Sequence, residues 1–308
     1  MTIFLTSAIL ALTVTQQAPA GSSSLEASLR EVIRSSGAEV AVAYRTLDGR
    51  GEVLIDPDKS FHAASTMKVP VMIELFRQAS AGALRLDDPL PIRNEFKSIV
   101  DGSAYTLSEG ADSDTAIYAA VGKTLTLTEL CEAMITVSSN FATNLLIEKL
   151  GVENVRQTVT RLGADGMQVL RGVEDQKAFD KGMNNTTTAR GLLVLLEKLA
   201  LGKAVNPKAD AEMIEVLKRQ KFNDAIPAGL PPGTAVAHKT GSITRIQHDA
   251  GVVYAERPYT VVVLVRGIQD QKESKALIAK LSKIIAGGPS ASPVGQAFGD
   301  VSEDRGLP

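Results

Sequence analysis

The stretch Tyr-Thr-Val-Val-Val-Leu-Val-Arg at residues 259–266 decides the class of fold. Five consecutive apolar residues in so short a segment are typical of a buried β-strand. Two strand-like runs precede it, at 234–238 and 249–255, and a helical pattern follows from about Asp270 to Ile285. Because strands joined by short turns favour antiparallel pairing, this end of the chain predicts an antiparallel sheet followed by a helix.

The N-terminal end contributes strands of the same kind. Val40, Val42 and Tyr44 stand at every second position, a turn signal follows at Asp48-Gly49, and a second apolar run lies at 53–55. This pattern predicts a β-hairpin. Most of the chain between the two ends has apolar residues at helical spacing.

We therefore predict an α/β fold of the α+β sandwich type. An antiparallel sheet built from both termini is flanked by helices and carries an inserted all-helical domain, with a catalytic cleft between the two parts. Residues 93–123 of the insertion show little periodicity and predict a surface excursion. The predicted parts are a signal peptide at 1–20, an α/β domain formed by 21–62 and 222–286, a helical domain at 63–221, and a disordered tail at 287–308.

The composition is that of a soluble globular protein and excludes several classes of function. Apolar residues make up 44% and charged residues 22% of the 308 residues, and the formal net charge is −2. No basic stripe is visible, so nucleic acid is not expected as a partner. The single cysteine, Cys131, lies in an apolar helical pattern and predicts a buried, inert thiol. The three histidines lack metal-ligand spacing, so we predict no metal site and no cofactor.

The first twenty residues have the pattern of an export signal. An apolar run from Ile3 to Val14 leads into Ala18-Pro19-Ala20, a small-residue pattern of the kind that precedes signal cleavage. The run is too short to act as a stable membrane anchor. We therefore expect an exported protein, periplasmic or secreted, that is cleaved after Ala20 and is a monomer. A buried N-terminal helix is the alternative.

Three short motifs stand out, Ser65-Thr66-Met67-Lys68, Ser138-Ser139-Asn140 and Lys239-Thr240-Gly241. In the first motif, Ser65 and Lys68 share one face at the start of a predicted helix. A neutral lysine there can take the serine proton, and the helix N-terminus provides N–H groups where an oxyanion would develop. The alternative is a surface lysine beside a helix-capping serine.

The second and third motifs suit substrate binding and proton transfer. The Ser138 hydroxyl can relay a proton to a leaving nitrogen, and the Asn140 carboxamide can hold a substrate amide, although both residue types are also common helix caps. On a strand, Lys239 and Thr240 suit a carboxylate, and Gly241 lets a ligand approach the backbone. An exposed edge strand is the alternative for the third motif.

Together the three motifs resemble those of the penicillin-recognising serine hydrolases, and the chain is similar to the class A β-lactamase-like members over about residues 25–285. The segments 138–146 (SSNFATNLL) and 185–188 (NTTT) also match this family. The resemblance implies a serine β-lactamase that hydrolyses the β-lactam amide bond through an acyl-enzyme on Ser65. Two alternatives remain open: a D,D-peptidase or esterase of the same fold, and a penicillin-binding sensor domain that acylates without turnover.

The resemblance also implies a role for each site residue. Ser65 would be the nucleophile and Lys68 its base, Ser138 would pass a proton to the lactam nitrogen, and Glu174 would activate the deacylating water. The backbone N–H groups of Ser65 and Ser242 would form the oxyanion hole. The substrate would be a small β-lactam or a D-Ala-D-Ala-like molecule. The residues implied to bind it are Asn140, Lys239, Thr240 and Ser242. We add Gly241 to the binding residues because of its place on the strand, and Arg245 and Arg266 as lesser candidates for binding the carboxylate.

The loop that carries Glu174 departs from the family pattern. It reads Arg171-Gly-Val-Glu174, one residue longer between arginine and glutamate than is usual. Ala178 stands where a second water ligand, an asparagine, is expected. The identity of the deacylating base therefore stays open between Glu174 and Asp175.

Two further departures concern carboxylates. Asn185 stands where an aspartate would pair with Arg171, which leaves Asp175 or Asp180 for that pairing. Ser139 occupies the middle of the second motif, where the family usually has aspartate. The sequence thus predicts an acylating site more firmly than it predicts fast release of the acyl group.

Overall fold

The computed structural model describes residues 20–288. The predicted signal peptide lies outside this range except for Ala20, with which helix α1 (Ala20–Ser36) begins. The predicted tail lies outside it except for its first two residues, which follow helix α9 (Gln271–Ala286). Export, cleavage and the tail therefore stay predictions. Within the described range, no helix has the length and apolar character needed to cross a membrane.

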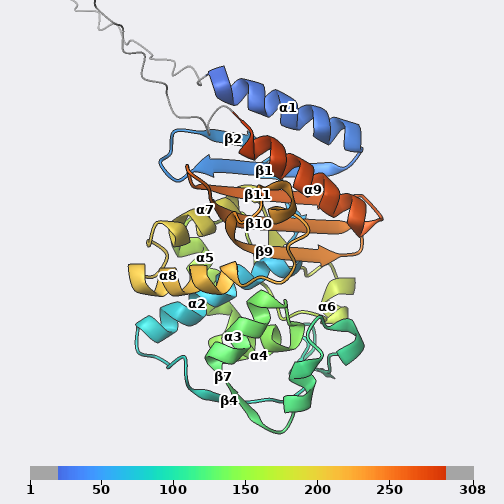
Figure 1. Ribbon diagram of the computed structural model, residues 1–308. Coiled ribbons are helices and arrows are strands. Elements are labelled where there is room, and N and C mark those ends of the chain that lie inside the picture. The colour runs from blue at the N-terminus through green and yellow to red at the C-terminus, as the bar shows by residue number, and fades with distance from the viewer. Residues whose placement is uncertain (1–19, 289–308) are drawn as a thin grey trace, which may run out of the picture.

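A five-stranded antiparallel sheet forms the upper half of the molecule in Figure 1. The predicted sheet is confirmed, and β11 lies at its centre, paired with β1 on one side and β10 on the other. The two ends of the chain thus meet in one sheet. In spatial order the strands are β2 (Glu52–Ile55), β1 (Glu39–Thr46), β11 (Tyr259–Arg266), β10 (Ile246–Tyr254) and β9 (Ala235–Ile243).

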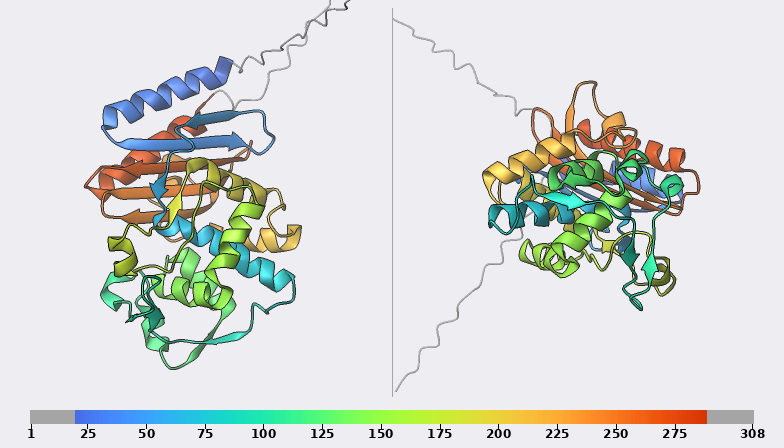
Figure 2. Two further views of the ribbon diagram at one scale, coloured as in Figure 1. Left: turned by 180° about the vertical axis from the view of Figure 1, so that it is seen from behind. Right: turned by 90° about the horizontal axis from the view of Figure 1, so that it is seen from below.

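Both faces of the central strand are buried, which explains its unbroken run of apolar residues. Val261, Val263 and Val265 belong to a core shared with α1 and α9, which cover one face of the sheet. Val262 and Leu264 belong to a second core that continues into the helical insertion. In the view from behind (Figure 2, left), the helical insertion lies below the sheet.

The insertion supplies most of the helices. Helices α7 and α8 contact the sheet directly, so the second core is shared between the sheet and the insertion. We keep 63–221 as the proposed range of the insertion. Its helices are α2 (Lys68–Ser80), α3 (Leu127–Thr136), α4 (Asn140–Leu150), α5 (Val152–Arg161), α6 (Gln176–Asp180), α7 (Ala189–Ala200) and α8 (Pro207–Lys218). The 3-10 helices are η1 (Ala64–Met67), η2 (Glu109–Ala111) and η3 (Ala116–Ala120), with η4 (Pro227–Gly229) beyond the insertion.

The insertion is mainly rather than entirely helical, because it adds short strands that the sequence pattern did not predict, and one of them pairs with a strand that lies just before the insertion. These strands have two or three residues each, too few to display a period of two. One pair lies in the aperiodic segment 93–123. The pairs are β3 (Phe61–His62) with β8 (Thr186–Thr187), β4 (Pro89–Pro91) with β7 (Thr124–Thr126), and β5 (Phe96–Lys97) with β6 (Ala104–Tyr105).

Candidate active site

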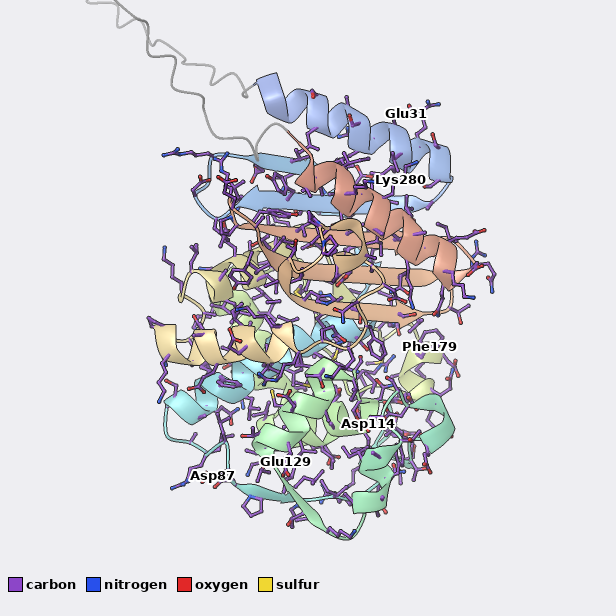
Figure 3. The ribbon with its side chains drawn as sticks, in the orientation of Figure 1. Glu31, Asp87, Asp114, Glu129, Phe179 and Lys280 are labelled. Carbon is purple, nitrogen blue, oxygen red and sulfur yellow. The ribbon has the colours of Figure 1, made fainter. Side chains whose placement is uncertain are left out.

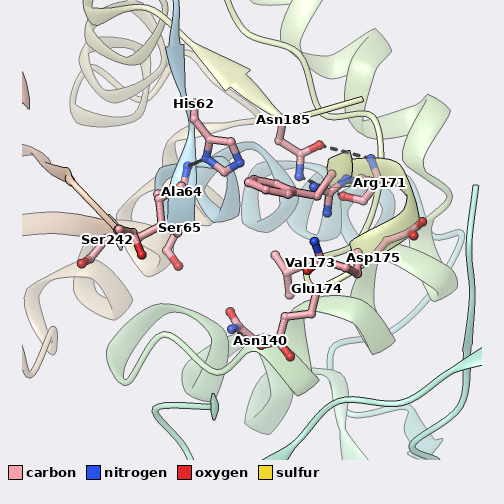
Figure 4. Close-up of a pocket in the computed structure, with 14 residues that line it drawn as sticks. His62, Ala64, Ser65, Asn140, Arg171, Val173, Glu174, Asp175, Asn185 and Ser242 are labelled. Atoms are coloured by element: carbon pink, nitrogen blue, oxygen red, sulfur yellow. Dashed lines mark hydrogen bonds between the residues drawn. The ribbon is translucent and has the colours of Figure 1, made fainter. Parts of the chain in front are cut away.

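The serine of the first motif lies where the chain turns into α2. Ser65 belongs to η1, which runs directly into α2, and Lys68 is the first residue of α2. Ala64, immediately before the serine, has a φ of 46°. This left-handed conformation is costly for a residue with a Cβ and clusters at functional sites. Figure 4 shows Ser65 pointing into the cavity from this turn.

Lys68 joins the first motif to the second. Its Nζ donates hydrogen bonds to Ser138 O at 2.7 Å, to Ser138 Oγ at 3.2 Å and to Asn140 Oδ1 at 2.9 Å. The side chain is completely buried. Burial, and after it the ammonium of Lys239, lower the pKa of Lys68 well below its usual range. A lysine whose pKa is lowered in this way can accept a proton near neutral pH.

Lys239, on β9, reaches the same serine from the third motif. Its Nζ donates to Ser138 Oγ at 3.0 Å and to Thr240 O at 2.9 Å. Burial lowers the pKa of Lys239 to about 7, although the nearby Asp249 carboxylate opposes the shift. Ser138 has a φ of 59°, and its hydroxyl lies between two lysines. The structure therefore brings all three motifs together around one hydroxyl group.

Gly241 lets β9 approach the backbone of the first motif. A Cβ at this position would lie 3.1 Å from the backbone nitrogens of both Ser65 and Thr66. Only glycine fits this contact without displacement of one segment. The next residue, Ser242, is exposed on the wall of the cleft. The N–H groups predicted to form the oxyanion hole thus belong to two adjacent backbone segments.

Glu174 faces the second motif across the cleft. Its Oε1 accepts a hydrogen bond from Asn140 Nδ2 at 2.8 Å, and its φ is 61°. The residue is exposed toward the cavity, but partial desolvation by the surrounding protein still raises the pKa of Glu174. Asn144 fixes the preceding residue, since it accepts from Val173 N at 2.6 Å and donates to Val173 O at 3.0 Å. A carboxylate is thereby held at the cleft with its pKa moved toward neutrality.

Asp175, the other candidate base, has a different environment. Its carboxylate accepts hydrogen bonds from Ser98 Oγ at 2.8 Å, Ile99 N at 2.9 Å and Ala178 N at 3.1 Å. The residue is 2% exposed. These bonds connect the loop to the segment after β5, so the Asp175 carboxylate holds the loop in place. The geometry therefore favours Glu174 over Asp175 as the base.

The two ends of the loop between Arg171 and Asn185 are joined by hydrogen bonds to uncharged acceptors and not by an ion pair. The prediction that Asp175 or Asp180 pairs with Arg171 is wrong: the guanidinium donates instead to two backbone carbonyls and one side-chain amide. The Asn185 amide adds a bond to Arg171 O at 3.0 Å and accepts from Leu170 N at 2.8 Å. The acceptors of the guanidinium are Met183 O, Gly172 O and Asn184 Oδ1, at 2.8, 3.0 and 3.1 Å.

Two adjoining cavities form the cleft. The first, of about 300 Å³, lies between η1 and the loop that carries Glu174 (Figure 4). The second, of about 270 Å³, extends along β9 to the start of α9. Ser65, Asn140 and Ser242 line both cavities. The candidate nucleophile therefore stands at their junction, where a substrate can occupy both sides.

A family model described as the β-lactamase enzyme family matches residues 24–287. The chain belongs to the β-lactamase enzyme family. The matched range includes all three motifs and both halves of the sheet.

Relatives of this β-lactamase-family chain cover most of its length. A β-lactamase of Streptomyces albus G is 29% identical over 277 residues, which are 86% of this chain and 84% of that protein. A mutant of PBP-A, solved as an acyl-enzyme complex with penicillin G, is 27% identical with a TM-score of 0.73, covering 85% of this chain and 95% of that one. A mutant of the class A β-lactamase of the last common ancestor of Gram-negative bacteria is 25% identical with a TM-score of 0.74, covering 85% and 97%. The predicted fold is confirmed by these matches.

The structure does not bring the two candidate arginines of this β-lactamase-family chain into the cleft. Arg245 lies in the tight turn between β9 and β10, has a φ of 59°, and donates to Gly267 O at 3.0 Å. Arg266 donates to Glu39 at 2.6 Å and lies over the Phe61 ring. Neither lines either cavity. The assignment of Arg245 to substrate binding is corrected accordingly, because the turn directs its side chain toward Gly267.

Sequence reasoning missed two contributors to this site. Asn144 holds the residue before Glu174, and its spacing of four from Asn140 was the one signal in the sequence, since residues so spaced share a helix face. Asp112 contacts the start of α4 from the aperiodic segment 93–123, where no periodicity marked it.

The cysteine lies outside both cavities of the cleft. Cys131 is buried as predicted, and burial raises its pKa to about 12, which keeps the thiol protonated and inert. Between residues 20 and 288, no group of three or more His, Cys, Asp or Glu side chains is arranged to hold a metal ion.

Proposed function

We propose that this protein is a serine β-lactamase that opens the β-lactam amide bond through an acyl-enzyme on Ser65. The observation that carries the proposal is the meeting of two buried lysines, Lys68 and Lys239, at the Ser138 hydroxyl beside the nucleophile. Glu174 faces this group from across the cleft through Asn140. Membership of the β-lactamase family supports the same reaction.

In the proposed acylation step, Ser65 Oγ attacks the lactam carbonyl carbon and its proton passes to the neutral amine of Lys68. The oxyanion is stabilised by the backbone N–H groups of Ser65 and Ser242. The C–N bond then breaks, and the lactam nitrogen receives a proton through Ser138 Oγ, which lies 3.2 Å from Lys68 Nζ. The product is an ester on Ser65, and Lys68 is neutral again.

Binding is assigned to the residues at the two sides of the nucleophile. Cationic Lys239, with Thr240 and Ser242, holds the substrate carboxylate by charge-assisted hydrogen bonds. The Asn140 carboxamide, already engaged by Lys68 and Glu174, holds the side-chain amide of the substrate. These contacts place the lactam carbonyl over Ser65.

In the proposed deacylation step, Glu174 takes a proton from a water molecule that attacks the ester carbonyl. The ester C–O bond breaks, the Ser65 oxygen takes the proton held by Glu174, and the opened product leaves as a carboxylic acid that ionises in water. The raised pKa of Glu174 supports this role, because a general base is most effective when its pKa lies near the operating pH.

The second candidate is a penicillin-binding protein that forms the ester with a β-lactam but does not hydrolyse it. A D,D-peptidase or an esterase of the same fold would behave in this way toward β-lactams while it turns over another substrate. Ala178 has no polar side chain to hold the attacking water together with Glu174. The acyl-enzyme complex known for PBP-A supports this candidate as well. The two candidates share the acylation step and differ in the fate of the ester.

Intact-mass measurement over time after mixing with penicillin G separates the candidates. A β-lactamase gains the mass of the whole substrate on Ser65 and then loses it, while hydrolysed product accumulates beyond one equivalent. A persistent adduct supports the penicillin-binding candidate instead. The Ser65→Ala variant is the control and should never gain mass. A parent protein that neither gains mass nor consumes substrate overturns both candidates.

We also propose that the protein is exported and cleaved after Ala20, as the small-residue pattern at Ala18-Pro19-Ala20 predicts. N-terminal sequencing of protein recovered from periplasm or culture fluid should begin at Gly21. Retention of Met1 in that material would contradict the proposal.

A further inference from the structure

A single carboxylate outside the three motifs holds the start of α4. Asp112 lies in the turn between η2 and η3, and it is 8% exposed. Its Oδ1 accepts a hydrogen bond from Asn140 N at 3.0 Å, and its Oδ2 accepts one from Phe141 N at 2.8 Å. Ser139 Oγ takes the next N–H group of the helix, from Ala142 at 3.2 Å. The first three N–H groups of α4 are thus satisfied by two side chains.

The same turn also supports the residue before the helix. Ser113 Oγ donates to Ser138 O at 3.3 Å, and this carbonyl is the one that accepts from Lys68 at 2.7 Å. Ala111 and Ser113 line the second cavity of the cleft beside Ser138. The turn at 111–113 is therefore part of the cleft wall, and the next residue along the chain, Asp114, is labelled in Figure 3.

The position of Asn140 depends on this helix start. Asn140 is the first residue of α4, and its side chain accepts from Lys68 and donates to Glu174. A shift of the helix start would therefore move Asn140 and disturb its hydrogen bonds to both Lys68 and Glu174. Ser139 Oγ accepts from Ala142 N, and the first two N–H groups of α4 are held by Asp112 instead.

We infer that Asp112 is a positioning residue of the active site: it supplies from the 93–123 segment the carboxylate that the second motif lacks at Ser139, and it fixes Asn140 between Lys68 and Glu174. The inference rests on the proposed function, because it assigns Asp112 to the same reaction. Asp112 touches no reacting atom; it acts through Asn140 and through its charge.

The charge of Asp112 acts on both proton acceptors. Three groups face Lys68 besides its hydrogen-bond partners: Lys239 on β9 lowers the pKa of Lys68, whereas Asp112 and Glu174 oppose the lowering. Asp112 also contributes to the raised pKa of Glu174, after desolvation. Removal of this one negative charge should therefore lower the pKa of both groups.

The test compares the parent with Asp112→Asn, which keeps the side-chain shape but turns an amide N–H toward a backbone N–H. We expect the acylation rate constant to fall at least tenfold. In a plot of this rate constant against pH, the decline on the acidic side should move to lower pH, because Lys68 would then stay neutral to a lower pH. Lysine labelled with ¹³C at Cε should show the Lys68 pKa falling in the same direction, whether or not the protein turns over substrate. The control is Glu109→Gln, which removes a charge from an exposed residue nearby and should leave both readouts unchanged.

A second variant separates positioning from simple folding. Adding Ser139→Asp to Asp112→Asn places a carboxylate at the N-cap of α4, where aspartate can accept from the N–H groups of Phe141 and Ala142, and should restore most of the acylation rate. Loss of thermal stability in Asp112→Asn with an unchanged pH limb and an unchanged Lys68 pKa would overturn the inference. If the parent is never acylated, the proposed function fails, and the ¹³C titration still decides whether Asp112 acts on Lys68.

Discussion

Lys68 and Lys239 donate hydrogen bonds to the same oxygen, Ser138 Oγ, at 3.2 and 3.0 Å. Both side chains are completely buried, and the acceptors of their other bonds are neutral oxygens. Two ammonium groups at such a distance repel each other, and the charge of Lys239 accordingly lowers the pKa of Lys68. A neutral Lys68 beside a cationic Lys239 is the state that suits a base next to an anion-binding site.

The first prediction follows from Lys239, whose pKa is lowered to about 7 by burial. If its cationic form binds the substrate carboxylate, kcat/KM should fall as the pH rises above about 7, because the lysine then loses its proton. Steady-state rates between pH 5 and 10 measure this limb. A substrate of which the carboxylate is esterified is the control and should lack the limb. A limb of equal size with the ester would contradict the assignment.

Removal of the Lys239 side chain gives the size of its contribution. A charge-assisted hydrogen bond contributes about 1.5–3 kcal/mol, so Lys239→Ala should lower kcat/KM by about 10- to 100-fold. Thermal unfolding of the variant should be measured alongside, since the lysine is buried. An unchanged kcat/KM for substrates that carry a carboxylate would remove Lys239 from substrate binding.

The second prediction separates Glu174 from Asp175. Glu174→Gln should acylate at nearly the parent rate and accumulate the ester, because the glutamine cannot take the proton of the attacking water. Asp175→Asn should instead destabilise the loop, since the Asp175 carboxylate accepts three hydrogen bonds. Comparison of the burst with the steady rate, together with the melting temperature, distinguishes the two. Accumulation of the ester in Asp175→Asn alone would show that Asp175 is the base.

These assignments show what could be predicted from the sequence. The strand over 259–266 was predictable because both of its faces are buried and the five positions 261–265 are all apolar. That Ser65 and Lys68 lie at one site was predictable because residues three apart share a helix face, and their catalytic roles stay predictions. Arg245 was assigned by type alone, and its direction depends on a turn with a positive φ that no local pattern reveals.

The contacts between distant segments could not be predicted in this way. Asp112 meets Asn140 across 28 residues of chain, and Ser98 meets Asp175 across 77. Such pairs depend on how an aperiodic segment folds over the helices. The hydrogen bonds from the Arg171 guanidinium to backbone carbonyl groups could not be predicted either. Every residue has a carbonyl group, and the sequence does not show which of them accepts from the guanidinium.

The third prediction concerns Gly241. A methyl group at this position would lie 3.1 Å from the Ser65 and Thr66 backbone nitrogens, so Gly241→Ala should push β9 away from η1. The predicted oxyanion hole would widen, and removal of one such donor typically lowers kcat by 10²–10³-fold. Stopped-flow acylation measures the loss. The matched control is Gly287→Ala at the end of α9, where φ is −88° and an added methyl would lie no closer than 3.5 Å to its neighbours. Equal acylation in Gly241→Ala and the parent would contradict the close approach.

The last prediction concerns stability and His248, which is buried beneath the first cavity wall. Its Nε2 lies 2.9 Å from His62 O, its Nδ1 accepts from Val265 N at 3.2 Å, and its ring packs edge-on against Phe61. Burial lowers the pKa of His248 from its usual 6.5 to about 4. Between about pH 6.5 and pH 4, this histidine therefore carries a proton in the unfolded chain but is neutral in the folded protein. The free energy of unfolding should fall with decreasing pH across this window, by about 1.4 kcal/mol per pH unit for one proton.

Urea unfolding at several values between pH 4 and 7.5 measures this slope, and the variant His248→Gln isolates the contribution of one residue. Carboxylates and His62 titrate in both proteins, so their effects cancel in the difference. The variant should be less stable than the parent at pH 7.5, because glutamine fills the site poorly, but its stability should depend less on pH. The two curves should converge as the pH falls. Parallel curves would show that His248 takes up its proton in the folded protein as readily as in the unfolded chain.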